Sequence, residues 1–387
     1  KYAPPEGYQP WNTANKRPET VISRPDQYVG ITTWTGDGND NRNITLMDGF
    51  DLLWYKQRSS TQYHYLEDTI RGASRSLFSN ANTGQSGVDS TKVKSFTKDG
   101  IVVGTDGAIN QNTEKYVAWT WKAGGRKNTF NVDDVGYASA SDAGLDGGSI
   151  NPTGASVGTK QGFSMITITT PSAGAYTVSH GLTKAPDFII YRIYDQAMSW
   201  YVWHQAYGAA NKYMLLNSTT DTGSGTYVFN NTLPTASVIT DYSSNSLHHN
   251  EGRAMLYYSW HDVPGLQKFG SYVANGAADG IFVELGFRPA LVWIKSESFT
   301  NSYTNWDIND SVRDTYNPAD ATLAANLSDT ENSGNIGTQK IDFLSNGFKI
   351  RQEPTSSSKN TDGETYIYCA WAEAPSIDLY GGGANAR

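Results

Sequence analysis

The chain has 387 residues and a formal net charge of −8; only 18% of its residues are charged, whereas Gly (38), Tyr (24) and Trp (11) are abundant. No cluster of Lys and Arg forms the basic stripe that binding to nucleic acid or to an anionic membrane surface requires. No apolar run approaches the roughly 20 residues that span a bilayer. We therefore expect no nucleic-acid partner and no membrane insertion.

The composition favours an all-β fold. Gly and Asn accept the positive φ angles of tight turns, and aromatic side chains suit pleated, half-buried surfaces. Aromatic residues make up 12% of the chain, enough to bury a substantial core. The length suits about two to four domains.

The first predicted element, residues 1–27, is an irregular arm rich in Pro. It carries neither an initiating Met nor the apolar segment of a secretory signal, so we expect a processed or longer protein. The last element, 376–387, is a Gly-rich tail. Neither end can form a core alone, and in an assembly we expect such arms to lie along a neighbouring subunit.

The first predicted domain spans 28–125 and contains four recognisable segments. It opens with an alternating strand at 28–34 and continues with an apolar run at 50–56 that ends in a cation. A short segment, Leu77-Phe-Ser-Asn80, follows, and an aromatic strand closes the domain at 116–121. The alternation and the apolar run both predict β-strands.

The next segment, 126–162, is rich in Gly, Ser, Asp and Ala, and its central part has no periodicity. We predict a linker or a long excursion there.

Two further domains, 163–265 and 269–375, repeat the same order of segments. Their counterparts lie at 163–168, 186–192, 215–217 and 255–260, and at 269–273, 289–295, 323–326 and 366–371. We therefore predict three tandem, diverged β-sandwich domains of a jelly-roll or lectin-like kind. Only 266–268 separate the last two, which predicts close stacking.

Each closing strand ends on a tryptophan in register: Trp121, Trp260 and Trp371. Side-chain alternation places this residue on one face with the residues two and four positions before it. We expect that face to be covered inside each sandwich, opposite the apolar runs. We expect the cations that end those runs to reach solvent: Lys56, Arg192 and Lys295.

An Asp-x-x-Arg motif occurs at 68–71 and again at 310–313, whereas the second domain has His204 and Tyr207 in the matching places. A catalytic pair is one interpretation, and a local ion pair that braces a turn is the other. The charges are lost in one copy while the flanking pattern is kept, which favours the structural role.

Three further groups are candidate metal ligands or nucleophiles. Asp37-Gly-Asn-Asp-Asn41, with Asp48, resembles an oxygen-rich calcium loop. However, Arg42 stands where such a loop needs Gly, and we favour a polar hairpin turn. The remaining candidates are His248, His249 and His261, with Glu251 nearby, and Cys369. The histidine spacing fits no zinc pattern, and the single cysteine lies in a strand, where we expect a buried, inert thiol.

Four tryptophans are candidates for a flat platform that stacks sugars: Trp34, Trp200, Trp203 and Trp306. Packing in the core or in a subunit interface is the alternative. No nucleophile elbow, phosphate-binding loop or His-Glu-x-x-His motif occurs, so we assign no catalytic residues, metal or cofactor. A glycan hydrolase with paired carboxylates is the least favoured hypothesis.

Several segments carry a family likeness: Asp68-Thr-Ile-Arg-Gly72, Tyr116-Val-Ala-Trp-Thr-Trp-Lys-Ala-Gly-Gly125, Pro289-Ala-Leu-Val-Trp-Ile-Lys295, Asp342-Phe-Leu-Ser-Asn-Gly-Phe-Lys-Ile350 and Asn385-Ala-Arg387. Together they resemble a repetitive family of virion or tail-fibre-like structural proteins of tailed bacteriophages, notably those that infect marine bacteria. The likeness covers nearly all of 28–387 and implies a place in the virion. No functional residues are carried over from that family, and the second domain departs most from the pattern.

We therefore expect a non-enzymatic virion structural protein, either a tail fibre or appendage component or a capsid-bound decoration or fibre. Its expected partners are itself, with a trimer as the first hypothesis, other virion proteins, and a host-surface glycan if it contributes to attachment. A carbohydrate-binding module or adhesin is the alternative function.

Overall fold

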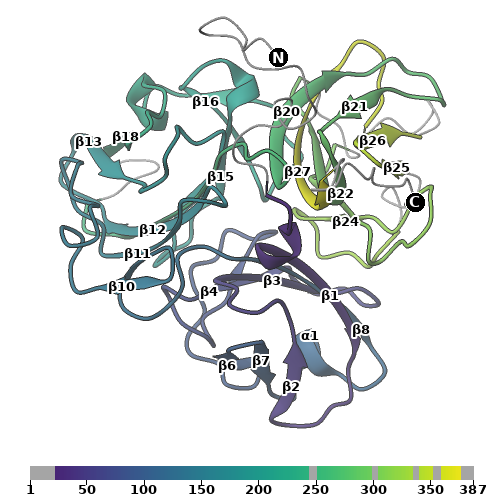
Figure 1. The fold of residues 1–387 in the computed structure, drawn as a ribbon, viewed down its shortest axis with the longest axis horizontal. Helices are drawn as coiled ribbons and strands as arrows, with labels where there is room; N and C mark the ends of the chain where they lie inside the picture. Colours follow the sequence, from purple (N-terminus) through teal and green to yellow (C-terminus); the bar gives the residue numbers. More distant parts are fainter. Residues whose placement is uncertain (1–21, 244–250, 299–303, 334–339, 352–358, 376–387) are drawn as a thin grey trace, which may run out of the picture.

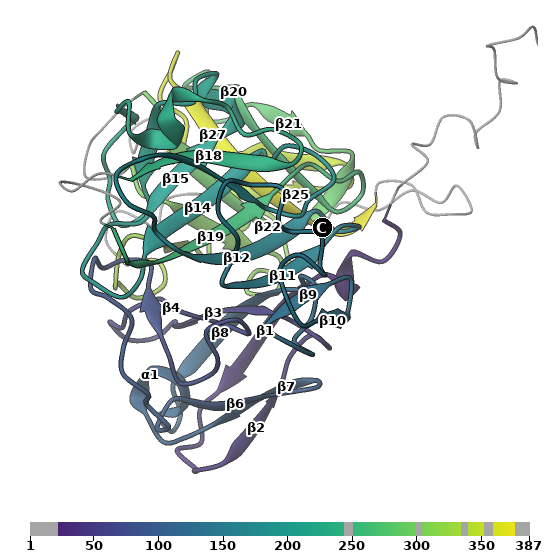
Figure 2. The same ribbon diagram turned by 90° about the vertical axis from the view of Figure 1, so that its left-hand side faces the viewer.

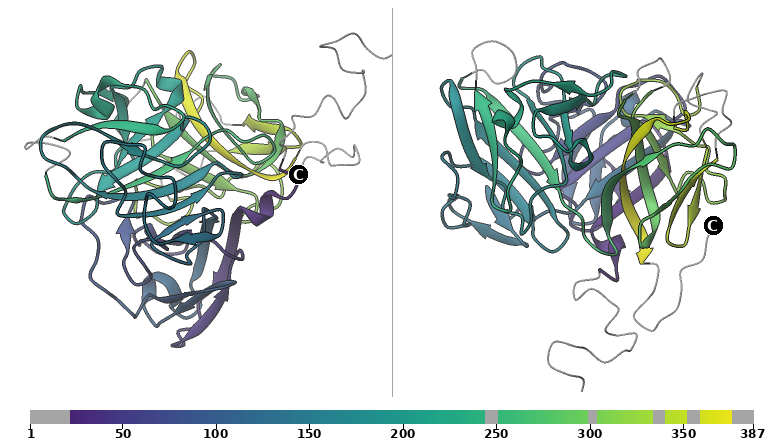
Figure 3. Two further views of the ribbon diagram at one scale, coloured as in Figure 1. Left: turned by 60° about the vertical axis from the view of Figure 1, so that its left-hand side comes forward. Right: turned by 90° about the horizontal axis from the view of Figure 1, so that it is seen from above.

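The computed structural model describes residues 22–243, 251–298, 304–333, 340–351 and 359–375. Almost all regular structure in these ranges is β-strand, which confirms the predicted all-β class. The short helices are α1 (Gly107–Asn110), η2 (Pro25–Gln27), η3 (Gln205–Tyr207) and η4 (Val228–Asn231). None of the helices in the described ranges is long and apolar enough to cross a membrane. Figure 1 shows three lobes that follow one another along the sequence, and the views in Figure 3 agree.

The first lobe, called sandwich 1, is formed by residues of the range 28–125. Its strands are β1 (Val29–Thr35), β2 (Arg42–Thr45), β3 (Leu52–Gln57), β4 (Tyr65–Asp68), β5 (Leu77–Phe78), β6 (Val93–Thr97), β7 (Gly100–Val103) and β8 (Lys115–Trp121). The larger sheet has the order β1-β8-β3-β4-β5, and β2-β7-β6 form the smaller one.

Sandwich 2 comes from the range 163–265. Its strands are β12 (Phe163–Thr169), β13 (Gly174–Ser179), β14 (Phe188–Ile193), β15 (Tyr201–His204), β16 (Lys212–Leu215), β17 (Gly223–Ser224), β18 (Val238–Ser243) and β19 (Ala254–Trp260). The order β12-β19-β14-β15-β16 lies within its larger sheet, and β13 pairs with β18 in the smaller one.

Sandwich 3 comes from 267–375. Its strands are β20 (Gln267–Val273), β21 (Phe282–Glu284), β22 (Phe287–Ser296), β23 (Asp307–Asp310), β24 (Leu323–Ala324), β25 (Ile341–Leu344), β26 (Gly347–Ile350) and β27 (Thr365–Pro375). Its larger sheet has the order β20-β27-β22-β23-β24, and β21-β26-β25 form the smaller one.

The same five-strand order thus recurs three times, and the register recurs with it. Trp121 pairs with Leu52, Trp260 with Phe188, and Trp371 with Leu291, always between the closing strand and the apolar run. This correspondence supports our inference of three copies of one domain. It also supplies equivalent positions, so that residues of these strands in one sandwich have counterparts in the other two.

The predicted packing of the tryptophan face is wrong. Closing strands and apolar runs are neighbours in one sheet, not opposed layers. One face of the larger sheet covers the smaller sheet, and in sandwich 1 it carries Leu53 and Tyr55. The other face carries Trp54 and Trp121 and joins a core shared by all three sandwiches. The runs are continuously apolar because both of their faces are buried. Figure 2 shows the smaller sheet of sandwich 1 on the outside of the molecule.

The three equivalent tryptophans meet where the sandwiches converge. Ring centroids lie 6.3 Å apart for Trp121 and Trp260, 5.5 Å for Trp121 and Trp371, and 6.2 Å for Trp260 and Trp371. All three contacts are edge-to-face, an arrangement that aromatic quadrupoles favour. None of the three side chains is more than 1% exposed. We call this cluster the tryptophan triad.

The predicted linker, 126–162, contributes strands of its own. It forms β9 (Phe130–Val132), β10 (Val135–Tyr137) and β11 (Gly154–Gly158), which extend the larger sheet of sandwich 2. β11 pairs antiparallel with β12, and β9 pairs parallel with β11. The strands are short, and Gly and Ser break their alternation, so the sequence pattern did not reveal them. Their effect is to cover the outer strand of that sheet.

The equivalent outer strands of the other two sandwiches, β20 and β1, have no further strand paired to them among the described residues. In sandwich 3, the Phe269 N–H donates to Asp262 Oδ1 at 2.8 Å and its carbonyl accepts from Gln205 Nε2 at 2.6 Å. In sandwich 1, β1 is the outermost strand of its sheet among the described residues. A groove of about 390 Å³ runs along Val29–Thr32 and is bounded on its far side by Val312 of sandwich 3.

Candidate functional site

The two Asp-x-x-Arg motifs sit at the ends of β4 and β23 and form the predicted local ion pairs. Arg71 Nε donates to Asp68 Oδ2 at 2.6 Å, and Arg313 Nε donates to Asp310 Oδ2 at 2.5 Å. Each arginine also donates to a backbone carbonyl of its own strand, that of Leu66 or Ile308. Because the carboxylates and guanidinium groups are almost fully buried, these pairs are more than surface salt bridges.

Each aspartate also binds a neighbouring sandwich, which sequence reasoning missed. Asp68 Oδ2 accepts a hydrogen bond from Tyr258 of sandwich 2 at 2.6 Å. Asp310 Oδ2 accepts one from the Trp119 indole of sandwich 1 at 2.9 Å. Trp119 and Tyr258 occupy equivalent positions on the closing strands. The motif therefore joins one sandwich to the next.

The exception in sandwich 2 has a physical explanation. Its neighbour, sandwich 3, carries Cys369 at the position of Trp119 and Tyr258, and a thiol is a weak donor. His204 replaces the aspartate, and its Nε2–H donates to the Tyr368 carbonyl at 3.1 Å. Burial lowers the pKa of His204 to about 4, so the imidazole is neutral. In sandwich 2 the aspartate, a hydrogen-bond acceptor, is thus replaced by a histidine that donates, because the facing group on sandwich 3 is the Tyr368 carbonyl, an acceptor.

Contacts of a second kind join the same pairs of sandwiches. The residue before the fourth strand of each larger sheet is His64, Trp200 or Trp306. The Trp200 indole donates to the Phe78 carbonyl of sandwich 1 at 2.7 Å, and the Trp306 indole donates to the Leu215 carbonyl of sandwich 2 at 3.0 Å. His64 lies beside Ala324 of sandwich 3. Sandwiches 1, 2 and 3 thus form a closed head-to-tail ring within one chain.

The cations that end the apolar runs are buried, which corrects the expectation that they reach solvent. Lys295 Nζ donates to the carbonyls of Thr304 and of Thr219 in sandwich 2, both at 2.9 Å. Arg192 Nη2 donates to the Thr83 carbonyl of sandwich 1 at 2.8 Å. Lys56 Nζ donates to the Gln57 and Ser60 carbonyls. Backbone carbonyls compensate each charge for the loss of water.

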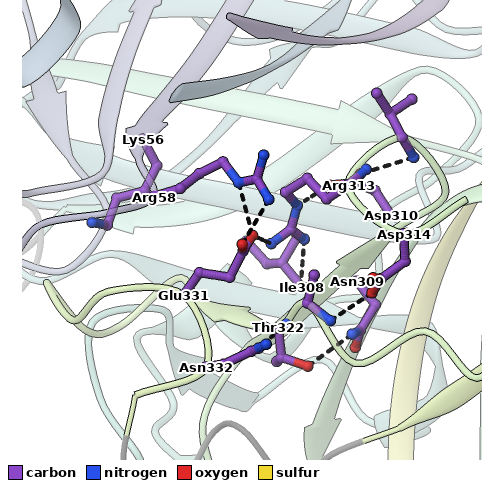
Figure 4. Close-up of polar contacts among 12 residues, drawn as sticks. Lys56, Arg58, Ile308, Asn309, Asp310, Arg313, Asp314, Thr322, Glu331 and Asn332 are labelled. Atoms are coloured by element: carbon purple, nitrogen blue, oxygen red, sulfur yellow. Dashed lines mark hydrogen bonds and ion pairs between the residues drawn. The ribbon is translucent and has the colours of Figure 1, made fainter. Parts of the chain in front are cut away.

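The contact between sandwiches 1 and 3 also includes a charge network (Figure 4). Arg58 of sandwich 1 binds Glu331 of sandwich 3 through two parallel hydrogen bonds of 2.9 and 2.7 Å. Arg313 donates to the same carboxylate at 2.9 Å. This bidentate geometry fixes the orientation of the Arg58 guanidinium relative to the Glu331 carboxylate, as well as their distance.

The candidate calcium loop is not a hairpin, because it crosses from β1 in the larger sheet to β2 in the smaller one. Asp37 Oδ1 accepts from the Asn39 N–H at 2.9 Å and from Asn110 Nδ2 at 3.1 Å, and Arg42 lies 3.5 Å from its other oxygen. Asp48 lies near Lys98 instead. Among the described residues, no group of three or more His, Cys, Asp or Glu side chains is arranged to hold a metal.

The remaining candidate ligands also serve local structure or fall outside the described ranges. His248 and His249 belong to the undescribed residues 244–250. His261 is buried, and its Nδ1–H donates to the Asp262 carbonyl at 2.8 Å. Cys369 is a buried free thiol on β27, as predicted, and burial raises its pKa well above the usual value.

The four candidate platform tryptophans do not form a sugar-stacking surface. Trp200, Trp203 and Trp306 are at most 4% exposed. Trp34 is half-buried, stacks on Tyr116 at 5.3 Å and donates its indole N–H to the Ile109 carbonyl at 3.0 Å. They pack as core and contact residues, which was the alternative.

Two buried carboxyl groups with raised pKa values are held by structural hydrogen bonds. Burial raises the pKa of Glu67 and of Asp241 to about 7. Glu67 accepts from Ser76 Oγ at 2.8 Å, and Asp241 accepts from the Tyr257 hydroxyl at 2.6 Å inside sandwich 2. A surface cleft of about 510 Å³ includes Lys184, His261 and Asp262, but Asp262 is engaged by the Phe269 N–H.

Comparison with known proteins identifies a family. The sequence model of a family described as a domain of unknown function (DUF7483) matches residues 24–375. That range runs from just before β1 to the end of β27 and so includes all three sandwiches. No curated protein and no solved structure matches the chain.

Removing one partner of a buried pair in the ring is expected to be costly. Asp310→Ala leaves the Arg313 charge and the Trp119 N–H without their shared acceptor, so we expect a loss of about 3 kcal/mol in the free energy of unfolding. Asp310→Ala/Arg313→Met removes both charges and should lose less. Chemical denaturation measures both values. Asp26→Ala, in the exposed Arg24–Asp26 pair, is the control and should change stability by under about 0.5 kcal/mol. Equal losses for Asp310→Ala and the control would contradict this role.

The buried carboxyl of Asp241 predicts a definite pH dependence. Its pKa is raised to about 7 in the folded protein from a usual value of 3.8, so the folded state keeps a proton that the unfolded state loses. This contribution to stability is present below the unfolded pKa and is lost as pH rises through the folded pKa. Relative to Asp241→Asn, the wild type should lose about 1 kcal/mol per pH unit between pH 4 and 7. Parallel stability profiles for the two proteins would contradict the shift.

Proposed function

The chain belongs to the family described as a domain of unknown function (DUF7483). We propose that it is a non-enzymatic structural protein of a bacteriophage virion. The observation that carries the proposal is the closed ring of three sandwiches around the tryptophan triad. A ring of this kind gives a particle a rigid unit whose three outward faces are related but not identical.

The use of the ionisable side chains supports a structural task. Asp68, Asp310, Lys295 and Arg192 are all engaged within or between sandwiches. Groups that do chemistry usually face a cleft, where a substrate can reach them. Here they stabilise the contacts between repeats.

The placement in a virion rests on the sequence resemblance to tail-fibre-like phage proteins. A tail fibre or appendage component and a capsid-bound decoration are both consistent with repeated sandwiches. In either setting the chain would assemble with itself and with other virion proteins, and a host-surface contact would be a further role. The burial of Trp200, Trp203 and Trp306 makes the carbohydrate-binding alternative less attractive, because those side chains cannot stack on a sugar.

We assign the self-contact to the open edge of β1. In sandwich 2 the equivalent strand is β12, and all five residues of β11 pair with its edge. β1 is outermost among the described strands of its sheet, and a groove separates part of it from sandwich 3 of the same chain. A second copy would contact β1 from the mouth of that groove. A trimer of chains remains the first hypothesis for the assembly.

Imaging and proteomics of purified phage particles test this proposal. We expect the chain in the virion proteome and density with three unequal lobes per chain, with copies in contact along β1. Absence of the chain from particles that are otherwise complete would overturn the virion role. Presence with contacts made only elsewhere would overturn the assignment of the β1 edge.

A further inference from the structure

The interior of sandwich 3 contains a lysine and an asparagine in direct contact. Lys359, in the connection between β26 and β27, places Nζ 2.6 Å from Oδ1 of Asn309 on β23. Lys359 is 0% exposed and Asn309 is 1% exposed. The surrounding core of this sandwich is largely apolar, with Val292, Ile294 and Phe348 among its members. A lysine amine is rarely buried beside a neutral amide without a reason.

A buried carboxyl group lies next to this pair. Asp307 is two residues before Asn309, so both side chains lie on the same face of β23. Its Oδ2 is 3.9 Å from Lys359 Nζ, and within the described part of the chain neither of its buried oxygens has a hydrogen-bond partner. Desolvation of an ionised carboxylate in such a place has a large free-energy cost, which favours the protonated acid.

Burial acts on both groups in the direction that favours their neutral forms. It raises the pKa of Asp307 to about 7 and lowers the pKa of Lys359 to about 8. A neutral amine has a free electron pair and is a nucleophile, and a carboxylic acid can donate a proton.

The amide is held in a fixed orientation. Asn309 Nδ2 donates to Thr322 Oγ1 at 2.8 Å, as Figure 4 shows, and this bond directs Oδ1 toward the lysine. The lysine backbone is fixed too, because the Tyr272 hydroxyl donates to the Lys359 carbonyl at 2.7 Å. The amine, the amide and the carboxyl group are therefore held next to one another before any reaction begins.

We propose that Lys359 and Asn309 condense to form an intramolecular isopeptide bond, with Asp307 as the acid–base group. The lysine nitrogen attacks Cγ of Asn309, and a new C–N bond forms as the carbonyl electron pair moves onto Oδ1. Asp307 stabilises that oxygen by donating a hydrogen bond. One proton passes from Nζ through the carboxyl group to Nδ2, the C–Nδ2 bond breaks, and ammonia leaves. The carboxyl group is regenerated, and no oxidant or cofactor is needed.

The other two sandwiches cannot form this bond at the same place. By strand register, the positions of Asn309 and Asp307 are occupied by Glu67 and Tyr65 in sandwich 1 and by Trp203 and Tyr201 in sandwich 2. Only the last sandwich therefore combines an amide with a carboxyl group at these two positions. The bond would tie β23 to the segment that leads into β27, closing a loop between residues 50 positions apart. A covalent link across such a loop resists unfolding.

Mass spectrometry of the denatured full-length chain tests the proposal directly. We expect a mass lower than that of the sequence by one ammonia molecule. Proteolysis should release a branched peptide that joins the segments containing Asn309 and Lys359. A wild-type chain of full mass would overturn the proposal. Loss of ammonia without the branched peptide, as in cyclisation of an asparagine onto the backbone, would also overturn it.

Variants separate the roles of the three residues. Lys359→Met and Asn309→Ala should restore the full mass, and Asp307→Asn should abolish or greatly slow formation of the link in a protein that still folds by circular dichroism. Lys268→Met is the matched control: it removes a half-buried lysine of the same sandwich, one that donates to the Glu284 carbonyl at 3.0 Å, and the link should persist. Undiminished linkage in Asp307→Asn would contradict the acid–base role.

Discussion

The packing of Trp121, Trp260 and Trp371 against one another is the constraint on which the rest of the structure depends. Each indole lies on the closing strand of a larger sheet, at the last residue of β8 and of β19 and within β27, so their contact brings three sheets face to face at one point. Burial of large aromatic side chains supplies much of the driving force, and edge-to-face geometry fixes their relative orientation. A larger sheet in this position is buried on both sides, which is why its central strands are apolar on both faces.

This arrangement determines what the polar side chains around the triad can do. Any charged group near it must find a partner in a neighbouring sandwich or on the backbone. Asp68, Asp310 and His204 each meet that requirement with a group on the next sandwich. The two aspartates accept hydrogen bonds and the histidine donates one, in each case matching the chemistry of the facing residue. The ring is thus specific, because an exchange of repeats would set acceptor against acceptor.

Much of the fold could be predicted from the sequence. The period-2 alternation of 116–121, 255–260 and 366–371 identified the closing strands, and the recurrent order of segments indicated three related domains. Alternation shows which residues share a face, but not whether that face meets its own second sheet or another domain, so the tryptophan face was misplaced. The burial of Lys56, Arg192 and Lys295 was missed for the same reason. Lys359 and Asn309 belong to no repeated motif and lie far apart in the sequence, so only the fold brings them together.

Calorimetry of the full chain tests the central claim, that the three sandwiches form one unit around the triad. If the shared core holds them together, heating should give a single transition, with a ratio of calorimetric to van't Hoff enthalpy of about one. Two or three separable transitions, or a ratio well above one, would show that the sandwiches unfold independently. The triad would then be only a contact between autonomous domains, which contradicts the claim that it holds them together as a single cooperative unit.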